Sequence, residues 1–299
     1  MAYQALVEKG TIFMRLTAEQ ACLNVDYEKC TQCGLCTKIC WTHAMVKNQQ
    51  GYPVMSQADP SDSWHSCWAC QRCMAVCPTG ALSICGKDPS RSVLTADRPS
   101  PQAVETLMLT RRTCRNYKDE DVDRATLEHI LKIVGNAPSG GCHQQVEFTV
   151  FPDKETFARF KHYFWERVQQ NAEQGIFPEG FNEKDFALVK KGMDHGKDVI
   201  FRGAPNLLLI HAAMDRGDWV VDTGIAMSYA ELLFNAYGLG TVVASFAGAA
   251  LKRLPDVQTR LGIPENHFLQ CPLIFGVPAI TFPRGVQRFD HLKIHTANF

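Results

Sequence analysis

The pattern of apolar and polar residues changes character near residue 86. Before that point the chain has short segments without long apolar periods. After it, apolar residues recur at helical spacing over residues 103–113, 123–134 and 218–237. Three prolines and several polar residues lie between the two parts and predict a linker. We therefore expect one domain over residues 1–88, a linker over 89–102 and a second domain over 103–299.

Local signals indicate where several elements of the second domain begin. Asp123 and Asp153 are predicted helix N-caps, because their side chains can accept from the free backbone N–H groups of a first turn. Short apolar runs predict buried strands at residues 146–151, 206–211 and 271–277, and residues 238–246 predict a loop and a strand. Since helices outnumber strands and several strands are apolar throughout, we expect an α+β fold in which helices cover a sheet.

Composition narrows the functional classes. The 299 residues include 31 basic and 31 acidic side chains, which argues against nucleic acid or a membrane as partner, since both favour a basic excess. No apolar stretch approaches the roughly 20 residues that span a bilayer, and residues 1–13 lack the apolar segment of a signal peptide. We expect a cytoplasmic protein. Its thirteen cysteines then indicate metal binding rather than disulfides, because the cytosol keeps thiols reduced.

Eight of the cysteines form two copies of one spacing. The first copy is Cys30-x-x-Cys33-x-x-Cys36-x-x-x-Cys40, and the second is Cys67-x-x-Cys70-x-x-Cys73-x-x-x-Cys77-Pro78. Three thiolates at this spacing can surround one face of a 4Fe–4S cluster, whereas the fourth lies too far round and binds the other cluster. The predicted ligand sets are Cys30, Cys33, Cys36 and Cys77 for one cluster, and Cys67, Cys70, Cys73 and Cys40 for the other. Zinc is the alternative, but structural zinc sites prefer paired C-x-x-C units separated by a longer loop.

Residues 24–85 resemble the bacterial two-cluster ferredoxins. Beyond the cysteines, the matching residues are Gly34, Pro78, Thr79, Gly80 and Ala81. Trp41 departs from the family, which usually has a proline after the fourth cysteine. The spacer between the two motifs is longer than in the smallest ferredoxins, and we expect it to form a loop or hairpin around Gly51.

A cluster of cations opens the second part of the chain. Arg111, Arg112 and Arg115 lie within five residues, together with Thr113, and no acidic residue lies within three positions upstream of Arg112. Because guanidinium groups can grip a phosphate dianion bidentately, this segment is a candidate phosphate site. An ordinary solvated helix end is the alternative.

A loop of small residues follows over 137–145 and opens onto a predicted strand. Small residues let the backbone approach a flat ring closely, and Ser139 and Gln144 can form hydrogen bonds with the polar edge of such a ring. A plain turn is the alternative interpretation of this loop.

These two segments resemble the nitroreductase family of FMN flavoproteins, a resemblance that spans roughly residues 104–288. Three further matches follow in the family's order: Asp222-Thr223-Gly224, Gly238-Leu239-Gly240-Thr241 and Gly276-Val277-Pro278. The resemblance implies an FMN-binding α+β sheet domain that forms an obligate homodimer, with two FMN sites at the interface.

The resemblance also implies which residues would bind FMN. The phosphate and ribityl chain would be held by Arg111, Arg112, Thr113 and Arg115, with Arg284 or Arg288 as a last phosphate contact. The ring would be lined from the other subunit by Pro138, Ser139 and Gly140, with Cys142 and Gln144 nearby. The backbone amides near flavin N5 would be those of Ala244 and Ser245. No catalytic side chain is assigned.

Cysteines outside the two motifs carry weaker hypotheses. Cys142 stands where the family commonly has asparagine, and one hypothesis makes it a nucleophile activated by His143, although neighbours on an extended loop point apart. Cys114 is either a thiol perturbed by flanking arginines or a residue packed inside the first helix of its domain. Cys22 and Cys85 are interpreted as small buried apolar residues.

Together the two parts indicate an internal electron path. Iron–sulfur clusters exchange single electrons, often at low potential, whereas FMN exchanges one or two. We expect an oxidoreductase in which a low-potential donor, such as reduced ferredoxin, feeds two 4Fe–4S clusters and FMN reduces a small organic acceptor such as a nitro compound. An anaerobic host fits this chemistry, and no dinucleotide-binding G-x-G-x-x-G segment is present. With the same cofactors, the alternatives are an activated alkene, a quinone or an organohalide as acceptor, or a non-enzymatic electron-transfer hub or redox sensor.

Overall fold

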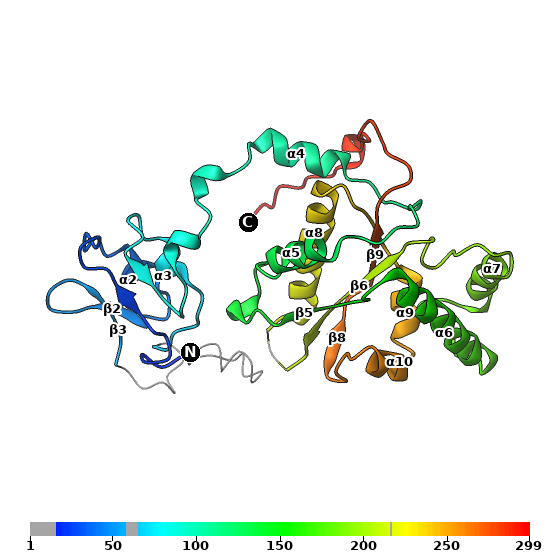
Figure 1. The fold of residues 1–299 in the computed structure, drawn as a ribbon, viewed down its shortest axis with the longest axis horizontal. Helices are drawn as coiled ribbons and strands as arrows, with labels where there is room; N and C mark the ends of the chain where they lie inside the picture. Colours follow the sequence, from blue (N-terminus) through cyan, green and yellow to red (C-terminus); the bar gives the residue numbers. More distant parts are fainter. Residues whose placement is uncertain (1–15, 58–64, 216) are drawn as a thin grey trace. The chain divides into compact units, whose positions relative to one another are not determined.

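A computed structural model describes residues 16–57, 65–215 and 217–299 of the chain, so the N-terminal segment that was assessed for a signal peptide lies outside the described residues. The chain divides into two compact units (Figure 1). The first unit holds the described residues up to Arg98 together with Gly140–His143, and the second holds Pro99–Ser139 and Gln144–Phe299.

The described part of the first unit contains two small antiparallel sheets and two short α-helices. Strand β1 (Asn24–Val25) pairs with β4 (Leu82–Ser83), and β2 (Met45–Lys47) pairs with β3 (Pro53–Met55). The helices α2 (Leu35–Ile39) and α3 (Arg72–Ala75) begin inside the two cysteine motifs. The hairpin expected around Gly51 is present as β2 and β3, and Gly51 has the positive φ of 87° that favours glycine.

The second unit is built on a five-stranded sheet. Its strands are β5 (Val146–Val150), β6 (Asn206–Ala213), β7 (Gly240–Val243), β8 (His267–Leu269) and β9 (Leu273–Gly276). They are ordered β5-β6-β9-β7, with β8 also pairing with β6, and every pairing is antiparallel.

The α-helices of this unit are α4 (Pro101–Thr110), α5 (Arg124–Val134), α6 (Lys154–Glu173), α7 (Glu183–Asp194), α8 (Trp219–Ala236), α9 (Ser245–Leu251) and α10 (Pro255–Arg260). Asp123 and Asp153 are N-caps of α5 and α6, as predicted, and accept from the backbone N–H groups of Thr126 and Thr156. Short 3₁₀ turns lie at η1 (Pro89–Arg91), η2 (Thr95–Asp97), η3 (Gly140–Cys142) and η4 (Phe289–His291).

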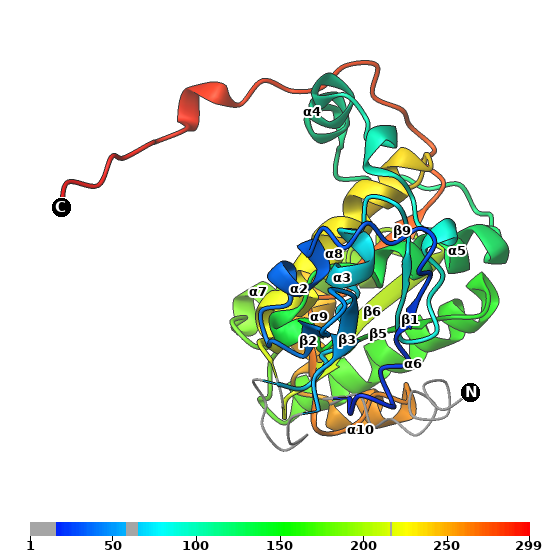
Figure 2. The ribbon, with the colours of Figure 1, turned by 90° about the vertical axis from the view of Figure 1, so that its left-hand side faces the viewer.

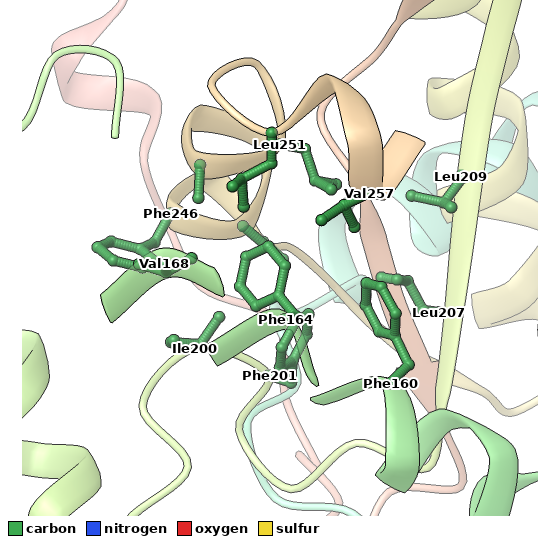
Figure 3. Close-up of a cluster of buried hydrophobic side chains, with 14 of the residues drawn as sticks. Phe160, Phe164, Val168, Ile200, Phe201, Leu207, Leu209, Phe246, Leu251 and Val257 are labelled. Carbon is green, nitrogen blue, oxygen red and sulfur yellow. The ribbon is translucent and has the colours of Figure 1, made fainter. Parts of the chain in front are cut away.

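The side chains of β6 alternate between two hydrophobic cores. Leu208 and Ile210 pack in a core with α5 and α8, whereas Leu207 and Leu209 pack in a core with α6, α9 and α10. Figure 3 shows the second of these cores, which is rich in phenylalanine. Helices therefore cover both faces of the sheet, and the predicted α+β class is confirmed. Within the described ranges, no helix has both the length and the apolar character needed to cross a bilayer.

Four sequence expectations need correction. The helix expected over residues 103–113 ends at Thr110, because the next residues turn extended and Thr113 pairs with Thr241 beside β7. Cys114 is therefore buried outside that helix rather than inside it. Residues 238–246 contain β7 but already enter helix α9 at Ser245. Cys22 is exposed, not buried, whereas Cys85 is buried as expected.

Candidate functional site

Two cavities in the first unit each gather four cysteines. The first is lined by three cysteines of the first motif and one of the second: Cys30, Cys33, Cys36 and Cys77. The other is lined by the reverse combination: Cys67, Cys70, Cys73 and Cys40. These are the two crossed sets that the spacing predicts, and their role as ligands stays a prediction.

The backbone repeats one unusual conformation in both motifs. The residues just before and just after the second cysteine have positive φ, with 54° at Gln32 and 77° at Gly34, and 50° at Ala69 and 57° at Gln71. A left-handed conformation costs a non-glycine residue about 1–2 kcal/mol, and such strain concentrates at functional sites. Alternating right- and left-handed residues also turn backbone N–H groups toward one concave side, as around many Fe–S sites. The backbone thus fits an anionic, thiolate-bound cluster in each cavity.

In the second cavity, the surroundings shift the pKa values of the cysteine thiols in different directions. Burial, together with negative charge on Cys67 and Cys70, raises the pKa of Cys73 to about 12. The neighbouring buried Cys85 thiol acts in the opposite direction on Cys67 and lowers the pKa of Cys67. Several thiolates can share this buried space only with a positively charged partner, which the iron ions of a cluster would supply.

A threonine two residues after the fourth cysteine of each motif is a feature that the sequence interpretation missed. The Cys40 sulfur lies 3.6 Å from the Thr42 hydroxyl, and the Cys77 sulfur lies 3.7 Å from the Thr79 hydroxyl. The Ala81 backbone N–H also donates to the Cys77 sulfur, at 3.3 Å. The common offset of threonine from the two cysteines was a signal that could have identified these contacts.

Trp41, the departure from the ferredoxin pattern, is part of the second cavity. Its ring stands edge-on to Trp68 with centroids 4.9 Å apart, and both tryptophans line the cavity that contains Cys40. The two rings add apolar surface around the predicted cluster site without displacing a cysteine.

The arginine segment of the second unit lies against the end of the sheet next to β7. Cys114 donates its backbone N–H to the Thr241 carbonyl at 2.9 Å, and Thr113 forms a parallel bridge with Thr241. Gly240 is required by this packing, because a Cβ atom there would lie 2.4 Å from the Cys114 Cβ atom. Cys114, at 5% exposure, therefore serves to pack the segment onto β7.

The arginines differ in their partners. The Arg111 guanidinium lies 3.4 Å from the Glu231 carboxylate of α8, an acidic partner 120 positions away that local sequence inspection could not find. Among the described residues, no carboxylate forms an ion pair with Arg112 or Arg115. Both guanidinium groups can therefore take a phosphate, whereas Arg111 is already held by Glu231.

The chain after β9 brings one of the two candidate C-terminal arginines close to this segment. The tail runs beside α4 and continues as an extended segment (Figure 1 and Figure 2). Gly285 lies so close to α4 that a Cβ atom there would be 2.6 Å from the Leu109 carbonyl oxygen. Arg284 precedes Gly285 in the chain, and Leu109 lies two residues before Arg111, where the arginine segment begins. The geometry favours Arg284 of the two.

The loop predicted to line a ring is closed by its own hydrogen bond. The Gln144 backbone N–H donates to the Ser139 hydroxyl oxygen at 2.8 Å, and Pro138 is exposed. Cys142 and Gln144 both have positive φ, at 57° and 48°. This strain is the kind found where a backbone is shaped around a ligand.

The two groups of predicted FMN residues lie at opposite edges of the sheet. The loop leads into β5 at one edge, whereas Thr113, Ala244 and Ser245 lie at β7 on the other, with β6 and β9 between them. Three strand spacings amount to about 14 Å. Within one chain, the two groups therefore form separate candidate half-sites.

The fold and these sites define a class of protein in which a two-cavity, cysteine-rich unit is joined to an antiparallel sheet covered by helices. Comparison with known families agrees with this description. The model of the nitroreductase family matches residues 108–277, more than half of the chain, and the model of the 4Fe–4S dicluster domain matches residues 29–82. The chain belongs to the nitroreductase family and carries a 4Fe–4S dicluster domain, so both predicted resemblances are confirmed.

Individual relatives are distant. An FMN reductase (NAD(P)H) of Bacillus subtilis strain 168 is 28% identical over 172 residues, which cover 56% of this chain and 63% of that protein, less than two thirds of its length. A nitroreductase with bound FMN from Desulfitobacterium hafniense DCB-2 has a TM-score of 0.51 and 22% identity, and covers 64% of this chain and 98% of its own. A second nitroreductase with bound FMN, from Bacteroides fragilis NCTC 9343, has a TM-score of 0.52 and 17% identity at the same coverage. The two structures share the fold of the second unit.

Proposed function

We propose that the protein is an FMN-dependent oxidoreductase that passes electrons from a low-potential donor through two 4Fe–4S clusters to FMN, and from there to a small organic acceptor such as a nitro compound. The observation that carries the proposal is the presence of two crossed four-cysteine cavities in a chain of the nitroreductase family. When bound, the clusters supply one-electron transfer and FMN supplies two-electron chemistry.

In the first unit, the residues of the chain would bind the clusters and exclude water. The eight motif cysteines are the ligands, and Thr42 and Thr79 orient the sulfurs of Cys40 and Cys77 through the contacts described above. Apolar side chains such as Leu82 and Ile84, both almost fully buried, keep the surroundings of the cavities dry. A low local dielectric makes each hydrogen bond to a cluster sulfur count for more.

In the second unit, the arginine segment would bind the FMN phosphate. Arg112 and Arg115 are available for a bidentate phosphate contact, with Thr113 beside them and Arg284 approaching from the tail. Arg111, fixed by Glu231, orients the segment and contributes positive charge. The Ala244 and Ser245 backbone would approach the ring, where the Pro138–Gln144 loop of a second chain would complete the site.

A homodimer would join the two half-sites, and exposed apolar side chains support this part of the proposal. Val104 and Met108 on α4 are 38% and 56% exposed, and Val221 and Tyr229 on α8 are 50% and 46% exposed. These positions would lose solvent contact if two copies of the second unit packed together. The tail adds further exposed apolar residues, among them Phe282.

Cofactor analysis followed by acceptor turnover tests the proposal. Anaerobically purified protein is expected to contain about eight iron and eight sulfide ions with one FMN per chain. After reduction with dithionite and removal of excess, a panel of nitroaromatics, enones, quinones and organohalides is added and flavin reoxidation is followed. Reoxidation no faster than in buffer for every compound would refute the enzyme and leave an electron-transfer hub or sensor.

A second candidate concerns the electron donor. The name of the Bacillus subtilis relative gives NAD(P)H as its reductant, so direct reduction of the flavin by NAD(P)H is the competing route. Stopped-flow mixing with NADH, NADPH and reduced ferredoxin separates the two, because our proposal requires the low-potential donor to be the fastest.

A further inference from the structure

Outside both cofactor regions, three potential metal ligands meet on one face of the sheet of the second unit. Glu147 in β5 is directly opposite His211 in β6, and His267 in β8 is two residues from Leu269, which is the partner of His211. The period of two along each strand places all three side chains on the same face. One ligand atom from each residue lies within 4.8 Å of the other two.

The two imidazole rings face each other through nitrogen atoms. The Nδ1 atoms of His211 and His267 are 2.9 Å apart, and Nε2 of His211 is 3.0 Å from the Thr149 hydroxyl. If Nε2–H of His211 donates to Thr149, the Nδ1 lone pair of His211 points at His267. In that tautomer the contact is a hydrogen bond from Nδ1–H of His267. Once the His267 proton moves to its Nε2 atom, both Nδ1 lone pairs can bind one cation, with the Glu147 carboxylate within reach.

Burial and surroundings suit an ion that enters from solvent. His211 is 2% exposed, whereas Glu147 is exposed and His267 is half-buried, so the cluster runs from the interior to the surface. His267 also lines an open cavity with Glu179, Asp256, Glu265 and Lys252. Glu179 pairs with Lys252 and Asp256 with Arg167, whereas no ion pair involves Glu265 among the described residues. The Glu265 carboxylate can raise the local concentration of cations at this entrance.

We propose that Glu147, His211 and His267 bind one divalent transition-metal ion of borderline softness, for which zinc is the representative probe. Two imidazoles and one carboxylate suit zinc and its neighbours, whereas calcium and magnesium prefer oxygen ligands alone. Thr149 acts as the outer partner that fixes the tautomer of His211. The bound ion joins β5, β6 and the three-residue strand β8, and three protein ligands leave a position open for water.

Zinc titration of the complete protein tests this site. The holoprotein, loaded with its clusters and flavin and treated with chelator, is titrated anaerobically with Zn²⁺ by calorimetry. Wild type is expected to take up one equivalent at micromolar affinity or better. His267→Gln and Glu147→Gln should weaken uptake by about 100-fold or more, and Thr149→Val by about 10-fold. His129→Gln, which changes an exposed histidine on α5, is the matched control and should leave uptake unchanged.

X-ray absorption at the zinc edge gives an independent readout, because iron absorbs at a different energy. The proposal predicts a shell of nitrogen and oxygen at about 2.0–2.1 Å with no sulfur. Sulfur at about 2.3 Å would assign the zinc to the cysteines instead and overturn the proposal. Equal uptake by wild type and His267→Gln, or no stoichiometric uptake by wild type, would overturn it as well.

Discussion

The thiols of Cys85 and Cys67 interact within the first unit, which lowers the pKa of Cys67, a predicted ligand of the second cluster, and raises the pKa of Cys85. Cys85 belongs to neither motif and is only 1% exposed. Its position resembles that of an apolar core residue, yet its S–H group contacts a sulfur that would carry negative charge. Hydrogen bonds to cluster sulfurs stabilise the more negative, reduced state and raise the reduction potential.

Replacing the Cys85 thiol is therefore expected to change the reduction potential of the second cluster alone. Cys85→Ala should lower the reduction potential of the second cluster by roughly 20–60 mV, since a hydrogen bond contributes about 0.5–1.5 kcal/mol. A redox titration followed by electron paramagnetic resonance measures both clusters in one experiment. Cys22→Ala, at an exposed cysteine outside the motifs, is the control. Equal shifts in both clusters, or none, would contradict the assigned role.

The crossed ligand sets predict which cysteine variants lose the same cluster. Cys40→Ala should damage the same cluster as Cys70→Ala, although Cys40 belongs to the first motif, because both line the same cavity. The electron paramagnetic resonance spectra of reduced Cys40→Ala and Cys70→Ala are expected to retain the same intact cluster, and Cys33→Ala to retain the other. A Cys40→Ala spectrum that matches Cys33→Ala instead would mean that each motif binds its own cluster.

The arginine segment predicts a phosphate-dependent defect. Arg112→Ala should weaken FMN binding by about 10- to 150-fold, because a hydrogen bond to a charged group is worth about 1.5–3 kcal/mol. Binding of riboflavin, which lacks the phosphate, should change little, and flavin fluorescence measures both. Arg124→Ala provides a control, since this exposed arginine pairs with Glu128 on α5. An equal loss of riboflavin and FMN binding would argue that Arg112 supports the fold and not the phosphate.

The close contact of Gly240 with Cys114 predicts that a larger residue at position 240 destabilises the fold of the second unit. Gly240→Ala should lower the free energy of unfolding of the second unit by about 1–3 kcal/mol, because the new methyl group collides with Cys114. Gly224→Ala is the comparison, since the nearest atom to a Cβ there is 3.6 Å away. Urea unfolding followed by tryptophan fluorescence gives both values. Similar stability of the two variants would mean that Cys114 can move aside.

Much of the second unit could be predicted because its signals are local. The N-caps Asp123 and Asp153, and the apolar strand that became β6, each follow from a few adjacent residues. Helices α7 and α10 were missed, since their faces are largely polar, and β8 was missed because it has three residues. The end of α4 could not be placed, because Thr113 leaves the helix for a pairing with Thr241 far along the chain.

The candidate sites also divide into features that local sequence spacing predicts and features that only long-range packing creates. The cysteine cavities follow from spacing alone, since short spacers leave few ways to surround a cluster. The pairing of Arg111 with Glu231 and the meeting of His211 with His267 depend on long-range packing. Nothing near His211 in the sequence marks its partners, so the contact with His267 could not be predicted.

The central claim is that electrons reach the flavin by way of the clusters. Anaerobic stopped-flow reduction of the flavin by reduced ferredoxin tests it most directly, in wild type and in a variant in which all eight motif cysteines are replaced by alanine and FMN content is verified. We predict fast reduction in wild type, at least a tenfold slower reaction in the variant, and little reduction of either by NADH. Rapid reduction of the variant's flavin by NADH, at the rate of wild type, would contradict the account.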